Sequence, residues 1–166
     1  MTNFKQLLKQ IKCFVFDVDG VLTNSALVIT PEGEFLRTMN IKDGYALQLA
    51  VRKGYKAAVI SGGHSNGVQL RMNRLGIADV FMGVEDKVKV FKHFILKQQL
   101  NASEIIYMGD DMPDIKVMQL CGIAACPNDA IPDIKKISTY ISPFNGGEGC
   151  VRDIIEQTMR LHGKWE

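Results

Sequence analysis

Short apolar runs alternate with helical patterns along most of this chain. Continuous apolar runs predict buried strands at 11–18, 56–63, 78–84, 104–111 and 122–128, with a short sixth at 138–144. The stretches between them have helical periodicity and predict helices at 43–53, 64–75, 86–99, 112–120, 130–136 and 148–161. This alternation is typical of βαβ units, in which helices cover both faces of a mainly parallel sheet. The predicted fold class is therefore α/β.

One segment interrupts the alternation. Residues 26–40, ALVITPEGEFLRTMN, form two extended runs around Pro31-Glu32-Gly33, which predicts a β-hairpin directly after the first strand. The arm ALVIT is apolar on both faces, whereas a strand with one solvated face alternates. We therefore expect the hairpin to pack against another chain; the alternative is that it folds back on its own domain. Residues 1–166 contain no linker or internal repeat, which predicts a single domain.

Composition and charge narrow the functional class. Hydrophobic residues make up 46% and charged residues 23% of the 166 positions, as in an ordinary globular protein. The formal net charge of +2 gives no electrostatic footprint for nucleic acid or a membrane surface. The first ten residues do not resemble a signal peptide, and no stretch approaches the ~20 apolar residues of a membrane span, so we expect a cytoplasmic protein. Four cysteines without a C-x-x-C pair argue for reduced thiols rather than a zinc site.

Polar clusters follow four of the predicted strands. In chain order they contain Asp17 and Asp19; Ser61, Gly62 and Gly63; Lys87; and Asp110, Asp111 and Asp114. Each cluster alone would be an ordinary turn, helix cap or solvated helix residue. Because ligands of open parallel sheets bind beyond the carboxyl ends of the strands, all four clusters are expected to meet at one edge. The set as a whole therefore indicates a functional site.

The residue types at this edge suit phosphoryl chemistry. Converging carboxylates repel one another unless a cation joins them, and their hard oxygen atoms suit Mg²⁺. A lysine supplies a point charge for phosphate oxygens, while a serine hydroxyl and loop amides supply hydrogen bonds. A carboxylate can attack phosphorus and form an aspartyl-phosphate. A second Asp two residues on can protonate the leaving oxygen and then deprotonate water.

The four clusters resemble the motifs of a known family. DVDGVLT, ISGG, Lys87 and GDDMPD are similar, over nearly the whole chain, to the four motifs of the haloacid dehalogenase superfamily of phosphotransferases. The resemblance implies a Rossmann-like three-layer fold, with Asp17 as the nucleophile and Asp19 as the general acid and base. It also implies that Ser61 and Lys87 hold the transferred phosphoryl group.

The same resemblance implies a magnesium site. Its ligands would be the side chain of Asp17, the backbone carbonyl of Asp19 and the side chain of Asp110. Asp111 and Asp114 would support the metal shell and orient the phosphate-binding lysine.

Two further segments resemble the subfamily of 3-deoxy-D-manno-octulosonate 8-phosphate phosphatases. They are RMNRLGI at 71–77 and GGEGCVRD at 146–153, where Asp153 stands in place of the usual Glu. The resemblance implies a phosphorylated sugar acid as substrate, in the synthesis of lipopolysaccharide precursors. Only about 25 residues separate the second and third motifs, so no separate cap domain is expected. The subfamily resemblance implies a homotetramer in which neighbouring subunits help to close each active site.

Substrate-binding residues are predicted around the second motif. Arg71 could pair bidentately with a sugar carboxylate, and Arg74 lies one helical turn away, although either could be a solvated helix arginine. Related phosphatases for nine-carbon keto acids place an acidic residue where this chain has Gly63, which favours the eight-carbon substrate. His64, beside Gly62 and Gly63, is read as a helix-start or substrate-edge group. The alternatives are a nonulosonate 9-phosphate phosphatase and a non-catalytic oligomeric scaffold.

Overall fold

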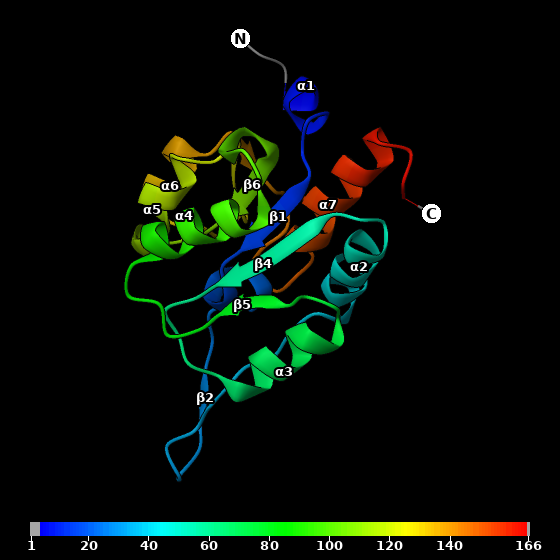
Figure 1. Cartoon of the computed structure of the whole chain (residues 1–166). Helices are drawn as coiled ribbons and strands as arrows, with labels where there is room; N and C mark the ends of the chain where they lie inside the picture. Colours follow the sequence, from blue (N-terminus) through cyan, green and yellow to red (C-terminus); the bar gives the residue numbers. More distant parts are fainter. Residues whose placement is uncertain (1–3, 166) are drawn as a thin grey trace.

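A six-stranded parallel sheet forms the centre of the computed structural model, which describes residues 4–165 (Figure 1). The strand order is β5-β4-β1-β6-β7-β8, and every neighbouring pair runs parallel, as predicted. The strands are β1 (Cys13–Phe16), β4 (Lys56–Ile60), β5 (Asp79–Phe81), β6 (Ile105–Met108), β7 (Ile123–Cys126) and β8 (Tyr140–Ile141). Since β1 lies between β4 and β6, its carboxyl end opens at the middle of the sheet edge.

Helices cover both faces of the sheet. One core contains residues of α1 (Phe4–Leu8), α2 (Ile41–Arg52), α3 (Asn66–Arg74) and α7 (Cys150–Leu161). The other contains residues of α4 (Lys87–Gln98), α5 (Ile115–Met118) and α6 (Pro132–Ile137). Side chains of β1 alternate between the two cores, as Phe14 and Phe16 face one and Cys13 and Val15 the other. This three-layer arrangement confirms the predicted fold class.

Two helical regions differ from the sequence-based expectation. The five-residue α1 was not predicted. The helix expected at 112–120 begins as a 3₁₀ turn, η3 (Met112–Asp114), and ends at Met118 as α5. Pro113 lies in η3, where its fixed φ and missing N–H are tolerated at a helix start.

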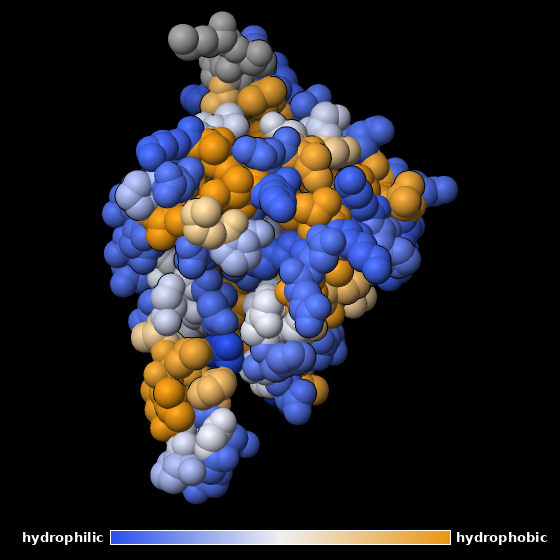
Figure 2. Space-filling view, turned by 90° about the vertical axis from the view of Figure 1, so that its left-hand side faces the viewer, coloured by the Kyte–Doolittle hydropathy of each residue, from blue (hydrophilic) through white to orange (hydrophobic). Residues whose placement is uncertain are grey.

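The hairpin projects from the body of the molecule and exposes apolar side chains. Its paired part is shorter than the predicted segment, because β2 (Val28–Ile29) and β3 (Phe35–Leu36) share only two residue pairs. Leu27, Val28, Ile29, Phe35 and Leu36 are 42–66% exposed. Figure 2 shows these apolar atoms gathered on the projecting arm. The arm does not fold back on its own domain, although the segment at its foot does reach the strand ends.

Two expectations concern membrane-spanning segments and the state of the cysteine thiols. Among residues 4–165, no helix combines the length and apolar character needed to cross a membrane. All four cysteines are free; Cys13, Cys126 and Cys150 are buried as expected, whereas Cys121 is only partly buried.

Candidate active site

The chain turns tightly directly after β1. Asp17 accepts a hydrogen bond from Val18 N at 2.7 Å through Oδ1, and the π-type turn η1 (Val18–Leu22) follows. Gly20 has a φ of +90°, which favours glycine, and its N–H donates to Thr23 Oγ1 at 3.3 Å. Thr23 N in turn donates to Val18 O at 3.1 Å. The turn thereby fixes the Asp17 carboxylate at the end of the central strand.

A buried lysine connects two carboxylates at this edge. Lys87, the first residue of α4, places Nζ 2.9 Å from Asp17 Oδ2 and 2.7 Å from Asp114 Oδ1. Asp114 is fully buried and also accepts hydrogen bonds from Tyr107 Oη at 2.7 Å and from Asp110 N at 3.2 Å. Both oxygens of Asp114 are therefore occupied, and its role is to hold the lysine against the end of β1.

The remaining carboxylates fit a divalent cation. Asp17, Asp110 and Asp114 offer oxygen atoms that all lie within 4.8 Å of one another. Asp110 Oδ1 is buried and has no hydrogen-bond partner among the described residues. A Cβ at Gly20 would lie 1.9 Å from Asp110 Oδ2, so only glycine lets this carboxylate approach the turn. Asp114 already accepts three hydrogen bonds, from Lys87, Tyr107 and Asp110 N, whereas Asp110 has the free oxygen, so Asp110 together with Asp17 is best suited to hold Mg²⁺.

Burial of like charges perturbs the pKa values of the cluster. Desolvation, with the Asp114 charge, raises the pKa of Asp17 to about 7, although Lys87 opposes the rise. Desolvation and the charges of Asp17 and Asp114 raise the pKa of Asp110 to about 8. Burial alone would lower the pKa of Lys87, but the two carboxylates beside it raise the pKa above its usual value. The carboxylates therefore keep protons at a pH where they would ordinarily be ionised, and a divalent cation would compensate the same negative charge.

The turn after β4 brings the second cluster to the same edge. Ser61 is buried, and its Oγ accepts a hydrogen bond from Gly63 N at 3.2 Å. Two backbone hydrogen bonds hold Ser61 to the end of β5 and the segment after it, since Ser61 N donates to Phe81 O and Val84 N donates to Ser61 O, each at 2.9 Å. The hydroxyl hydrogen of Ser61 remains free to donate to a ligand at the strand ends.

Arg37, which the sequence did not single out, contacts the second carboxylate of the opening motif. Its Nε donates to Asp19 Oδ1 at 2.6 Å and its Nη2 to Asp19 Oδ2 at 2.9 Å. Gly63 lies against this pair, since a Cβ there would come within 2.9 Å of both Arg37 Nη2 and Asp19 Oδ2. The sequence signal was weak, because a single arginine after an apolar strand has no motif around it.

Several predicted residues lie at the margin of the cluster or away from it. Asp111 is exposed and caps η3 by accepting from Met112 N at 2.7 Å, so the support expected from it comes from Asp114. His64 is exposed and its ring lies over Gly83. Arg74 is exposed and lines a depression on α3.

Arg71 lies closer to the site. It lines a groove of about 480 Å³ together with Arg37 and the foot of the hairpin. Arg71 also lines the depression beside Arg74, so the two arginines of α3 remain neighbours, and only Arg71 also reaches the groove at the foot of the hairpin.

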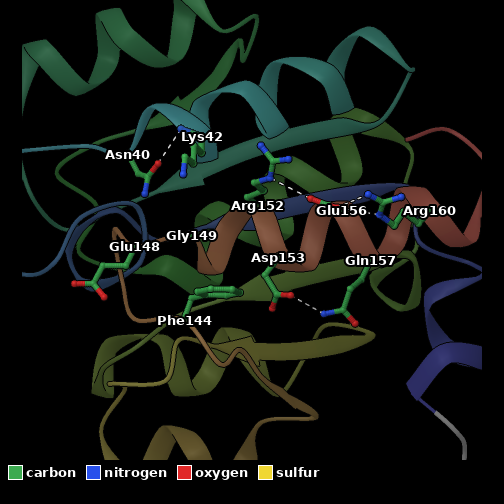
Figure 3. Close-up of a pocket in the computed structure, with 10 residues that line it drawn as sticks. All are labelled: Asn40, Lys42, Phe144, Glu148, Gly149, Arg152, Asp153, Glu156, Gln157 and Arg160. Carbon is green, nitrogen blue, oxygen red and sulfur yellow. Dashed lines mark hydrogen bonds and ion pairs between the residues drawn. The ribbon is translucent and has the colours of Figure 1, made fainter. Parts of the chain in front are cut away.

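A larger depression of about 680 Å³ lies elsewhere, between the start of α2 and α7 (Figure 3). Two of its arginines pair with Glu156, which accepts from Arg152 Nε at 3.0 Å and from Arg160 Nη2 at 2.7 Å. Asp153 accepts from Gln157 at 2.8 Å. No residue of the four sequence clusters lines it. We therefore place the chemistry at the strand ends rather than in this depression.

Comparison with known proteins agrees with this geometry. Residues 70–154 match the family model of haloacid dehalogenase-like hydrolases. The 3-deoxy-D-manno-octulosonate 8-phosphate phosphatase KdsC of Salmonella typhi is 30% identical over 163 residues, which cover 98% of this chain and 87% of that protein. This chain belongs to the haloacid dehalogenase-like hydrolases. Within the family it groups with the KdsC subfamily, as the motifs indicated.

Solved structures of this hydrolase subfamily have the same fold. The Yersinia pestis 3-deoxy-D-manno-octulosonate 8-phosphate phosphatase has a TM-score of 0.94 at 28% identity, with 96% of this chain and 86% of that chain covered. The Moraxella catarrhalis enzyme, solved with a magnesium ion, a phosphate ion and a KDO molecule, has a TM-score of 0.91 at 30% identity, with 95% and 90% covered. The chain is thus a KdsC-like hydrolase with an acidic site suited to a metal.

Proposed function

We propose that this hydrolase is a Mg²⁺-dependent phosphatase that converts 3-deoxy-D-manno-octulosonate 8-phosphate into the free sugar acid and inorganic phosphate. The observation that carries the proposal is the buried Lys87 ammonium between Asp17 and Asp114, beside the unpartnered Asp110 Oδ1. This arrangement combines a carboxylate nucleophile, a fixed positive charge and an open position for a cation. The reaction would serve lipopolysaccharide precursor synthesis in the cytoplasm.

In the first step, a carboxylate oxygen of Asp17 attacks phosphorus and forms an aspartyl-phosphate. The bond between phosphorus and the ester oxygen breaks, and Asp19 gives its proton to the leaving alkoxide. In the second step, Asp19 takes a proton from water, which attacks phosphorus. The bond to Asp17 breaks, so that inorganic phosphate leaves and the carboxylate is restored.

The other clusters hold the group that is transferred. The Lys87 ammonium and the Ser61 hydroxyl would bind phosphoryl oxygens, with loop amides around Gly62 as further donors. The side chains of Asp17 and Asp110 and the backbone carbonyl of Asp19 would hold Mg²⁺. The ion would neutralise charge on the transferred group.

Recognition of the sugar acid is assigned to the groove at the foot of the hairpin. Arg71 lines this groove and would pair with the substrate carboxylate. Gly63 supports an eight-carbon rather than a nine-carbon substrate, because related phosphatases for nine-carbon keto acids carry an acidic residue at this position. His64 and Arg74 are exposed and would act at most at the edge of the substrate.

The proposal is tested by phosphate release from the octulosonate 8-phosphate and from a nonulosonate 9-phosphate, with and without chelator. We expect a preference of more than about tenfold in kcat/KM for the eight-carbon ester. The Asp17→Asn variant should fold, bind the ester and release no phosphate. A smaller preference would favour the nine-carbon alternative, and turnover by Asp17→Asn would refute the assigned nucleophile.

We further propose that a second copy of this chain covers the apolar hairpin, within a homotetramer. The support is the exposure of Ile29 and its neighbours on a two-stranded arm that has no cap domain beside it. Ile29→Asp should lower the mass measured by light scattering, whereas Leu96→Asp should leave it unchanged. Leu96 on α4 is a matched control, since it is 78% exposed against 66% for Ile29. A wild-type protein that is monomeric at micromolar concentration would contradict this assembly.

A further inference from the structure

Arg37 follows β3 directly and points its guanidinium at the strand ends. Besides its two bonds to Asp19, it donates from Nη1 to Phe35 O at 3.0 Å. The Arg37 side chain is only 4% exposed, whereas the Asp19 side chain is 35% exposed. A paired, planar fork of this kind fixes the plane of a carboxylate as well as its distance.

Asp19 depends on this contact for its orientation. Within residues 4–165, Arg37 is the only hydrogen-bond partner of the Asp19 carboxylate. The carboxylate is otherwise partly exposed, and the neighbouring Gly20 has no side chain for it to pack against. Without the fork, the Asp19 side chain would be free to rotate among its staggered conformers.

Three chain segments that are distant in sequence converge on this pair. The carboxylate comes from η1, the guanidinium from the foot of the hairpin, and Gly63 from the turn after β4 leaves the space that both occupy. The hairpin itself has only two cross-strand pairs. Its foot is therefore held to the body by side-chain contacts, among them the Arg37–Asp19 pair, rather than by an extensive sheet.

We propose that Arg37 is a positioning residue, which holds Asp19 in the orientation needed for proton transfer and so makes acid catalysis depend on the hairpin. This inference rests on the proposed phosphatase function. Displacing the general acid lowers the rate most when the leaving group needs a proton, which is the case for an alkoxide. It lowers the rate little when the leaving group departs readily as an anion.

The test compares phosphate esters with different leaving groups. kcat/KM reports the formation of the aspartyl-phosphate and is measured for the sugar 8-phosphate, phenyl phosphate and 4-nitrophenyl phosphate. For Arg37→Met we expect a loss of about 100-fold on the sugar ester and less than about 5-fold on 4-nitrophenyl phosphate. Arg37→Lys should recover part of the loss, because it keeps a charge but not the fork.

Arg160→Met is the control, since Arg160 is an exposed arginine of α7 that pairs with Glu156. It should behave as wild type, and thermal unfolding should show that all variants fold. Equal losses on the three esters, or a loss confined to KM, would overturn the inference and assign Arg37 to phosphate or substrate binding. Wild-type hydrolysis of aryl esters without the sugar ester would instead refute the proposed substrate, and the comparison would then use phenyl and 4-nitrophenyl phosphate.

Discussion

Binding of Mg²⁺ should displace protons from the buried carboxylates. Because burial raises the pKa of Asp110 to about 8 and that of Asp17 to about 7, the metal-free protein at pH 7 keeps part of its protons on this pair. A ligating carboxylate must be ionised, so binding at pH 7 should release on the order of one proton. For Asp110 alone, the apparent affinity should rise about 50-fold between pH 6 and pH 8.

The same pKa values predict the stability of the metal-free protein. Between the ordinary carboxyl pKa of ~4 and pH 8, the folded chain keeps protons that the unfolded chain has already released. Its free energy of unfolding should therefore fall as the pH rises across this window. Saturating Mg²⁺ should oppose this fall, since a ligand at about 100 times its Kd adds about 2.7 kcal/mol.

Isothermal titration calorimetry in buffers of different ionisation enthalpy measures the protons released. Asp110→Asn should release fewer protons than the wild type at pH 7 and should bind Mg²⁺ more weakly. Asp133→Asn is the control, because Asp133 is an exposed carboxylate of α6 that pairs with Lys136. An affinity that stays constant from pH 6 to pH 8, without proton release, would refute the idea that burial of like charges sets these pKa values.

Three other substitutions test the cation site, a buried carboxylate of α2 and the support of Asp114. Gly20→Ala would place a Cβ 1.9 Å from Asp110 Oδ2, so stabilisation by Mg²⁺ in a thermal melt should disappear. Gly33→Ala is the control, because Gly33 has a similar φ of +84° with open space around it, and this variant should retain the stabilisation. A normal Mg²⁺ response in Gly20→Ala would contradict the site. Asp43 is buried beside the N-terminus of α7, and desolvation raises its pKa to about 6. As the pH rises from 4 to above 6, the free energy of unfolding of the wild type should therefore fall by up to about 3 kcal/mol relative to that of Asp43→Asn. The same difference between the two proteins in urea unfolding at both pH values would disprove this. Tyr107→Phe should lower the free energy of unfolding by about 1 kcal/mol by removing one buried hydrogen bond, and an unchanged urea midpoint would show that bond to be dispensable.

The sequence predicted the sheet and the meeting of its polar clusters because both follow from chain order. Parallel strands bring their carboxyl ends to one edge, so Asp17, Lys87 and Asp110 had to meet once the strands were located. The predicted strands were longer than those observed, as apolar runs continue into the turns that carry the site. This is visible in β1, which ends at Phe16 directly before the turn that carries Asp17 and Asp19.

Contacts that depend on tertiary approach were not predictable. Tyr107 lies in an apolar strand and resembles a core residue, yet its hydroxyl bonds to Asp114. Arg37 reaches Asp19 only because of the angle at which the hairpin leaves the body, and no periodicity encodes that angle. The five residues of α1 are too few to show a helical period, and their packing against the core decides their conformation.

The central place of β1 has a consequence for biosynthesis. A nascent chain that has emerged only as far as α4 already holds Asp17 and Lys87, but the acidic partners that follow β6 are still to be made. Magnesium can therefore contribute little to the earliest collapse of the polypeptide. The ion would stabilise the fold only late, after the fourth parallel strand, β6, has docked beside β1.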